Sequence, residues 1–83
     1  MIVRNRVKDF EKWKAVFDEE SDSSEAYGLK LENLWRSIDD PNEVFFILSV
    51  ESVEKAHEFV SLPESAETGV RSGVIDGEFW IVE

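Results

Sequence analysis

His57 and Tyr27 are the side chains of this sequence best suited to proton transfer, and each is the only residue of its type in the 83-residue chain. An imidazole titrates near neutral pH and tends to lose its charge when buried, so His57 could accept a proton from a phenolic hydroxyl. The spacing of Val53, Ala56, His57 and Val60 predicts a helical stripe that turns the His57 ring toward the interior. We therefore predict His57 and Tyr27 as catalytic residues. The alternative is that His57 bonds a backbone carbonyl and fills space.

Trp13, Asn33 and Trp35 are the candidate substrate-binding residues. Ligand pockets usually combine apolar walls with a few convergent polar groups. The two indoles would form walls, while Tyr27 and Asn33 would orient the hydroxyl of a phenol or quinol. In the competing interpretation, Trp13 and Trp35 simply belong to the hydrophobic core.

Arg4 and Arg6 lie two residues apart, so they share one face if residues 1–7 form a strand. An arginine is costly to bury without a partner, so this face should hold carboxylates or an anionic ligand. Because the chain is strongly acidic, carboxylates of this or a second subunit are the simpler partners.

The sequence predicts no metal site. It contains one histidine and no cysteine, so a zinc site would need several carboxylates around His57. Asp39 and Asp40 precede Pro41 and are interpreted as turn residues, not as a catalytic pair. There is no glycine-rich phosphate loop, nucleophile elbow or zinc-ligand spacing.

Composition excludes several classes of partner. Nineteen Asp and Glu residues against nine Lys and Arg residues give a net charge of −10. This charge would repel the phosphates of nucleic acids and anionic membranes, so neither is an expected partner. There is no signal-peptide pattern and no apolar run of about 20 residues, so we expect a cytoplasmic protein that does not span a membrane.

The chain is organised around a predicted hairpin between Leu29 and Val50. Its turn is Asp39-Asp40-Pro41-Asn42, in which Pro41 presets φ and the acidic and amide side chains accept local hydrogen bonds. The second strand, residues 44–50, is apolar at six of seven positions, so both of its faces must be covered. We therefore expect this strand to lie deep in a sheet.

The other expected elements flank this hairpin on both sides. Ser61 and Glu64 have the spacing of a capping box, and Gly73 and Gly77 are expected to bracket a turn. The expected elements are a strand over residues 1–7, a helix over 10–20 capped by Asp9, a helix over 53–60 capped by Ser52, a helix from about 62 to 71, and a final strand over 78–83.

The order strand, helix, strand, strand, helix, strand predicts one α+β domain over residues 1–83. Right-handed crossovers lead to a ferredoxin-like βαββαβ arrangement, a four-stranded antiparallel sheet with its first and third strands central and its helices on one face. Phe45 and Phe46, or Phe79 and Trp80, must then fall on opposite faces of the sheet. An aromatic patch would remain on the open face, and a homodimer through that face would cover it.

Three segments resemble the small dimeric α+β barrel proteins: VKDFEKWKAVFDE, LWRSIDDPNEVFFILSVES, and LPESAE with GVIDGEFWIVE. This superfamily includes cofactor-independent antibiotic-biosynthesis monooxygenases and polyketide-cyclase-like proteins. The resemblance covers nearly the whole chain, and it implies a pocket between sheet and helices in each protomer, with no metal, flavin or other cofactor. It carries no catalytic motif onto specific positions.

Three functions are compatible with the sequence. The first is a cofactor-independent monooxygenase or cyclase that acts on a small aromatic or polyketide-like molecule. The second is a carrier or sensor that binds the same kind of small molecule without catalysing a reaction. The third is a structural dimer that interacts with another protein. A His57 in contact with both a cavity and an orienting acceptor would favour the enzyme.

Overall fold

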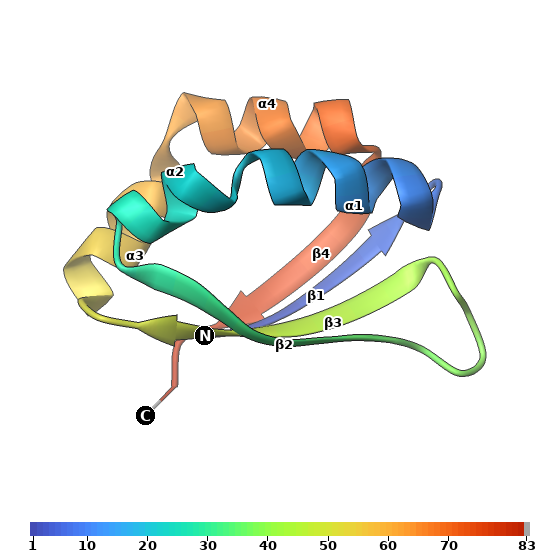
Figure 1. Cartoon of the computed structure of the whole chain (residues 1–83), viewed down its shortest axis with the longest axis horizontal. Coiled ribbons are helices and arrows are strands. Elements are labelled where there is room, and N and C mark those ends of the chain that lie inside the picture. The colour runs from blue at the N-terminus through green and yellow to red at the C-terminus, as the bar shows by residue number, and fades with distance from the viewer. Residues whose placement is uncertain (83) are drawn as a thin grey trace.

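A computed structural model describes residues 1–82 as one sheet covered by helices (Figure 1). The strands are β1 (Ile2–Val7), β2 (Leu29–Arg36), β3 (Glu43–Val50) and β4 (Val74–Trp80). The helices are α1 (Phe10–Glu19), α2 (Ser21–Ala26), α3 (Val53–Ser61) and α4 (Pro63–Ser72). The strands are antiparallel in the order β2-β3-β1-β4, and the helices lie on one face of the sheet. The predicted ferredoxin-like α+β fold, with its first and third strands central, is confirmed.

Side-chain caps begin two of the helices where the sequence predicts them. Asp9 accepts hydrogen bonds from the backbone N–H groups of Glu11 and Lys12, at 2.9 and 3.4 Å. Ser52 accepts one from Lys55 at 3.4 Å. These bonds satisfy N–H groups that have no partner within the helix.

The predicted capping box between Ser61 and Glu64 is wrong. Ser61 is the last residue of α3, and α4 begins after Leu62 without a side-chain cap. Pro63 at the first position of α4 needs no N–H partner, which makes a cap less necessary there. The Ser65 hydroxyl instead donates to the carbonyl of Phe59 and ties the two helices together.

The serine-rich segment after α1 also differs from the expectation. Residues 21–24 are expected from their serines to weaken the helix, but Ser21–Ala26 form a second short helix. The hydroxyls of Ser21 and Ser24 donate to carbonyls three residues earlier. This bonding is common for serine near helix ends, and here it accompanies the change of direction between α1 and α2.

The last strand begins at Val74, four residues before the predicted start. Gly73, with φ 83°, ends α4 in the left-handed conformation, as a C-terminal glycine often does. Gly77 is not in a turn but lies in β4 opposite Asn5. A Cβ at Gly77 would come within 2.3 Å of the Asn5 Oδ1 and 2.9 Å of the Arg4 carbonyl oxygen, so close packing explains this glycine.

The apolar residues on the two faces of the sheet differ in how deeply they are buried. On β3, Val44, Phe46 and Leu48 are buried under the helices, whereas Phe45 and Ile47 point to the open face and are partly buried. The buried core is built from residues of both layers: Met1, Val7, Trp13, Leu29, Val44, Phe46, Leu48 and Ala56.

On the open face, direct strand pairing aligns large apolar side chains. Ile2 pairs with Trp80, and Trp35 pairs with Phe45, so the members of each pair point to the same side. Ile2, Trp35 and Trp80 are 38, 49 and 46% exposed. We call the surface formed by these residues the open-face patch; it consists of Ile2, Trp35, Phe45, Ile47 and Trp80.

Candidate functional site

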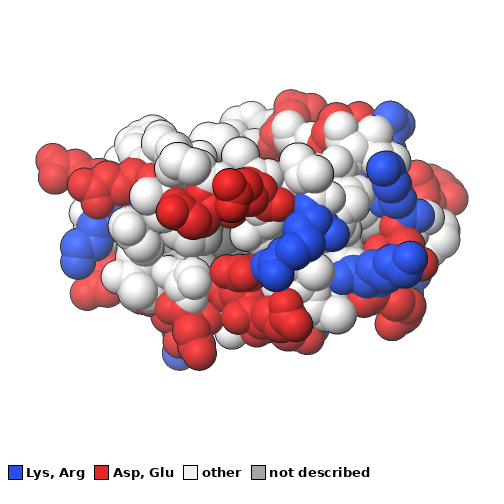
Figure 2. All heavy atoms as spheres, turned by 90° about the horizontal axis from the view of Figure 1, so that it is seen from above, with Lys and Arg blue, Asp and Glu red and all other residues white. Residues whose placement is uncertain are grey.

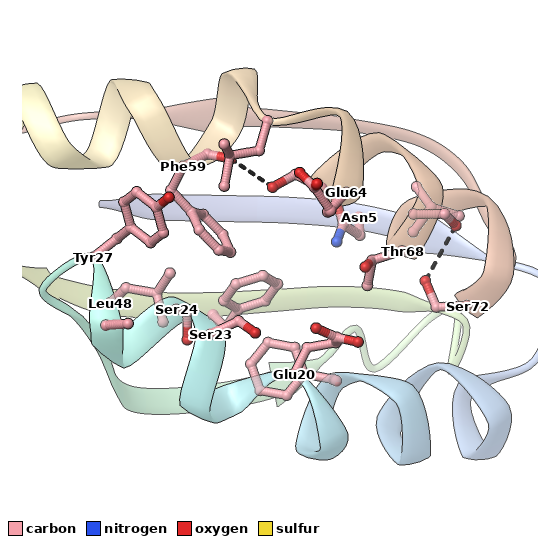
Figure 3. Close-up of a pocket in the computed structure, with 17 residues that line it drawn as sticks. Asn5, Glu20, Ser23, Ser24, Tyr27, Leu48, Phe59, Glu64, Thr68 and Ser72 are labelled. Carbon is pink, nitrogen blue, oxygen red and sulfur yellow. Dashed lines mark hydrogen bonds between the residues drawn. The ribbon is translucent and has the colours of Figure 1, made fainter.

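A cavity of about 520 Å³ lies between the sheet and the helices (Figure 3). One wall comes from the end of α1 and from α2, and the opposite wall from the end of α3 and from α4. The floor is formed by residues of β1 and β3, with a contribution from β4. The volume falls within the range that is usual for small-molecule sites.

Aromatic rings form the apolar part of this cavity. Phe17 of α1 and Phe46 of β3 meet edge to face, with their ring centroids 5.1 Å apart. The rings of Tyr27 and Phe59, which also line the cavity, are 5.6 Å apart and tilted (Figure 3). Leu48 also lines the cavity (Figure 3). The surface offered to a ligand is therefore suited to a flat aromatic molecule.

Polar side chains converge on the same space. Ser65 and Ser72 line it, but their hydroxyls are used in bonds to the carbonyls of Phe59 and Gly69. The Tyr27 hydroxyl makes no hydrogen bond to any other residue in the described part of the chain, and Asn5 and Thr68 line the cavity as well (Figure 3). These groups can serve a ligand, because a polar group next to an apolar ligand is costly to leave unpaired.

Two carboxylates border the cavity from opposite walls. Glu20 stands at the junction of α1 and α2, and Glu64 is in the first turn of α4 (Figure 3). Glu20 pairs with Arg71 of α4 at 2.5 Å, and the same guanidinium lies 3.9 Å from Glu19. This ion pair links the two walls of the cavity.

Among the predicted site residues, only Tyr27 lines the cavity. His57 is exposed and absent from the lining, so its expected orientation toward the sheet is wrong. The buried face of α3 is centred on Ala56, which is fully buried, and on Phe59, which packs against the core. The helix is thus rotated away from the stripe that we inferred from the sequence.

The three predicted substrate-binding residues are not brought together. Trp13 is 2% exposed and stacks on Phe17 at 4.8 Å, so it is a core residue behind the cavity wall. Asn33 and Trp35 are exposed and point to the open face of the sheet, because they pair with Ile47 and Phe45. A register shift between Leu31 and Asn33 accompanies this placement.

Sequence reasoning missed most of the cavity residues. Asn5 had a usable signal, because it alternates with two arginines and shares a strand face with Val3 and Val7. A polar residue on a face that must be buried is a candidate for a site. The polar residues of α4, such as Thr68, carried no comparable signal.

The expected pairing of Arg4 and Arg6 with acidic side chains is confirmed. Arg4 lies 3.0 Å from Glu43, 3.5 Å from Asp76 and 3.6 Å from Glu78, and Arg6 lies 3.1 Å from Asp76. The hydrogen bond with Glu43, with smaller contributions from the other carboxylates, raises the pKa of Arg4. All of these partners come from the same chain.

Within residues 1–82, no three histidine, aspartate or glutamate side chains cluster so that they could hold a metal ion. The same residues contain no helix that is long and apolar enough to cross a membrane.

No protein-family model matches the sequence, and no curated protein matches it significantly. Solved structures do match the fold. A protein from Lactobacillus acidophilus NCFM, described as a candidate monooxygenase, superposes with a TM-score of 0.66 at 25% identity. The alignment covers 93% of this chain but only 40% of that protein.

Two further structures are described as candidate antibiotic biosynthesis monooxygenases. The one from Nitrosomonas europaea has a TM-score of 0.66 at 16% identity, over 93% of this chain and 80% of that one. The one from Deinococcus radiodurans has a TM-score of 0.64 at 12% identity, and the alignment covers 100% of this chain and 94% of that one. The chain has the fold of the antibiotic-biosynthesis monooxygenases. The resemblance to the dimeric α+β barrel superfamily is confirmed at the level of the fold.

Proposed function

We propose that this protein binds a small aromatic or polyketide-like molecule in the cavity and acts on it as a cofactor-independent monooxygenase. The supporting observation is the cavity itself, in which aromatic rings from both walls surround a tyrosine hydroxyl without a protein partner. The fold shared with candidate monooxygenases is consistent with this assignment.

The proposed chemistry requires a substrate that can lose a proton to form a stabilised carbanion. The carbanion adds O₂, and the resulting peroxide loses water to leave a carbonyl. A CH₂ group and one O₂ thus give one C=O and one water, and the substrate supplies all of the electrons. Tyr27 is the residue we propose for positioning the substrate hydroxyl and for exchanging its proton. In the cyclase form of the proposal, the same carbanion attacks a carbonyl of the substrate instead.

Binding without chemistry is the second candidate, and one observation favours it. No hydrogen bond joins Tyr27 to an orienting base in the described part of the chain, whereas catalytic acid–base groups are usually oriented by a neighbour. In this case the protein is a carrier or sensor for the same class of ligand.

We also propose that the protein is a homodimer through the open-face patch. Ile2, Trp35 and Trp80 expose between 38 and 49% of their surface on one side of the sheet. A contiguous apolar patch of this kind is unusual on a monomer, and face-to-face packing of two sheets would cover it. An interface larger than roughly 2,000 Å² would be typical of an obligate dimer.

The experiment is a screen of phenols and quinols that records both the melting temperature and oxygen consumption. The monooxygenase predicts that a ligand which raises the melting temperature also consumes oxygen, and that Tyr27→Phe abolishes consumption while retaining most of the affinity. Ligands that stabilise the protein without oxygen uptake or product formation would support the carrier. If no compound of this class binds, the proposed function is wrong.

A further inference from the structure

The ionisable side chains that line the cavity are Glu20, Tyr27 and Glu64. In the described part of the chain, no lysine, arginine or histidine lines it. The cavity therefore offers a ligand only hydroxyls, an amide and negative charge. Figure 2 looks onto the helix layer and shows acidic side chains over much of it, with basic ones gathered mostly toward one end.

The two carboxylates are not equivalent. Glu20 already has a counter-charge in Arg71, although that arginine also approaches Glu19 and so stands between two carboxylates. Glu64 makes no ion pair with any of residues 1–82, and it lies on the α4 side of the cavity beside Thr68 (Figure 3). Glu64 is therefore the carboxylate whose charge is available to a ligand.

These charges discriminate between ligands that share the same aromatic ring. A ligand carboxylate would lie among like charges, and Arg71, the cation beside Glu20, is already shared by Glu20 and Glu19, so the desolvation of the ligand would be poorly offset. A protonated amine would be attracted by Glu64, and it would also interact favourably with the faces of the surrounding rings. An uncharged phenol would experience neither effect.

We propose that the cavity selects aromatic amines, with the ring against the apolar floor and the protonated amino group toward Glu64. This inference rests on the proposed binding of an aromatic molecule in this cavity and specifies its charge. The ring lies between Phe46 and Phe59, which line the cavity from the sheet and from α3. The ammonium lies beside the first two turns of α4, where Glu64 and Thr68 provide acceptors.

The test compares three probes with one ring and different charges: tyramine, 4-ethylphenol and 4-hydroxyphenylacetate. Calorimetric titration of the full chain at neutral pH should give the tightest binding for tyramine and the weakest for the carboxylate. Raising NaCl from about 0.05 to about 0.5 M should weaken only tyramine, because salt shortens the screening length below roughly 10 Å.

Glu64→Gln should weaken tyramine roughly threefold to fivefold, the effect of one partly exposed charge pair, and leave 4-ethylphenol unchanged. Glu67→Gln is the matched control, because Glu67 is exposed on the same helix and does not line the cavity. Equal or tighter binding of the phenol or the acid, or equal effects of the two variants, would overturn the inference while the proposed function stands. Binding of none of the three would overturn both.

Discussion

On the covered face of the sheet, Phe46 and Leu48 are buried within a single chain, whereas on the open face Trp35 and Trp80 remain almost half exposed. The two faces also treat charge differently. Arg4 on the open face has three carboxylate partners within 4 Å, while Glu64 at the covered cavity has no ion-pair partner among residues 1–82. The open face therefore combines paired arginines with exposed apolar surface, whereas the cavity on the other face combines buried apolar residues with a carboxylate that has no ion-pair partner among residues 1–82.

This contrast separates assembly from ligand binding. Apolar surface without a partner is covered best by another apolar surface, which suits an interface. A carboxylate without an ion-pair partner and a hydroxyl without a protein partner, both beside a cavity, are free to bind the polar groups of a small ligand. The predictions below test whether each face has the role that its unsatisfied groups indicate.

Trp13→Ala should produce the largest effect. Trp13 is 2% exposed and contacts both Phe17 and Phe46, so its removal leaves a large void under the helices. We expect a loss of about 3–5 kcal/mol in the free energy of unfolding, measured by urea denaturation. Val70→Ala, at a position 81% exposed on α4, should change it by less than about 0.5 kcal/mol. A small effect of Trp13→Ala would show that the covered face is not the core.

Trp35→Glu should dissociate the proposed dimer. Trp35 lies on the edge strand β2 but is the most exposed of the large residues of the patch, and a charge there would face apolar surface without a partner. Buried aromatic residues of interfaces often contribute about 2 kcal/mol or more, which corresponds to roughly 30-fold in affinity. Sedimentation at micromolar concentration should change from about twice the chain mass to the chain mass. Ile38→Glu is the control, because Ile38 is fully exposed in the hairpin loop, away from the patch. If the parent protein sediments as a monomer, the proposed dimerisation through the open-face patch is wrong.

Gly77→Ala should destabilise the protein by roughly 1–3 kcal/mol through overpacking. The added methyl would meet the side chain of Asn5 and the backbone of Arg4, and backbone cannot move aside easily. Gly69→Ala is the opposite case, because nothing lies within 4 Å of its Cβ position and the residue is in α4. It should stabilise the protein by about 0.5–1 kcal/mol. If thermal unfolding shows the same sign for both, the packing at this edge of the covered face differs from our description.

Arg4→Met should lower the midpoint of thermal unfolding, but by less than Gly77→Ala does. Arg6→Met should lower this midpoint by less than Arg4→Met. Arg4 contacts three carboxylates and Arg6 one, so the first change leaves more negative charge unopposed. Because its carboxylate partners raise the pKa of Arg4, the stabilisation from its charge is present at neutral pH and is lost as the pH rises into the strongly alkaline range. Ligand affinity should not change, because neither arginine lines the cavity. A selective loss of affinity would instead assign these cations to an anionic ligand.

Sequence patterns predicted the fold well because its causes are local. Asp9 and Ser52 are capping residues at helix starts, and the apolar run over residues 44–50 identified a central strand. The site was predicted less well, since its residues come from α2, α4, β1 and β3 and meet only through packing. The rotation of α3 decided the position of His57, because Ala56 and Phe59 are the residues that this helix turns toward the core. A four-residue stripe could not resolve that rotation.

His57→Gln should have the smallest effect. His57 is exposed on the outer side of α3, and it neither lines the cavity nor makes a side-chain hydrogen bond in the described part of the chain. Glutamine keeps the hydrogen-bonding capacity and removes the titration, so the variant isolates proton exchange. We expect stability within about 0.5 kcal/mol of the parent. Ligand affinity and any turnover should match the parent from about pH 6 to 8, the range in which histidine titrates. A change in the pH profile with unchanged stability would restore the imidazole to the mechanism, and it would require ligand chemistry on the outer surface of the helix layer.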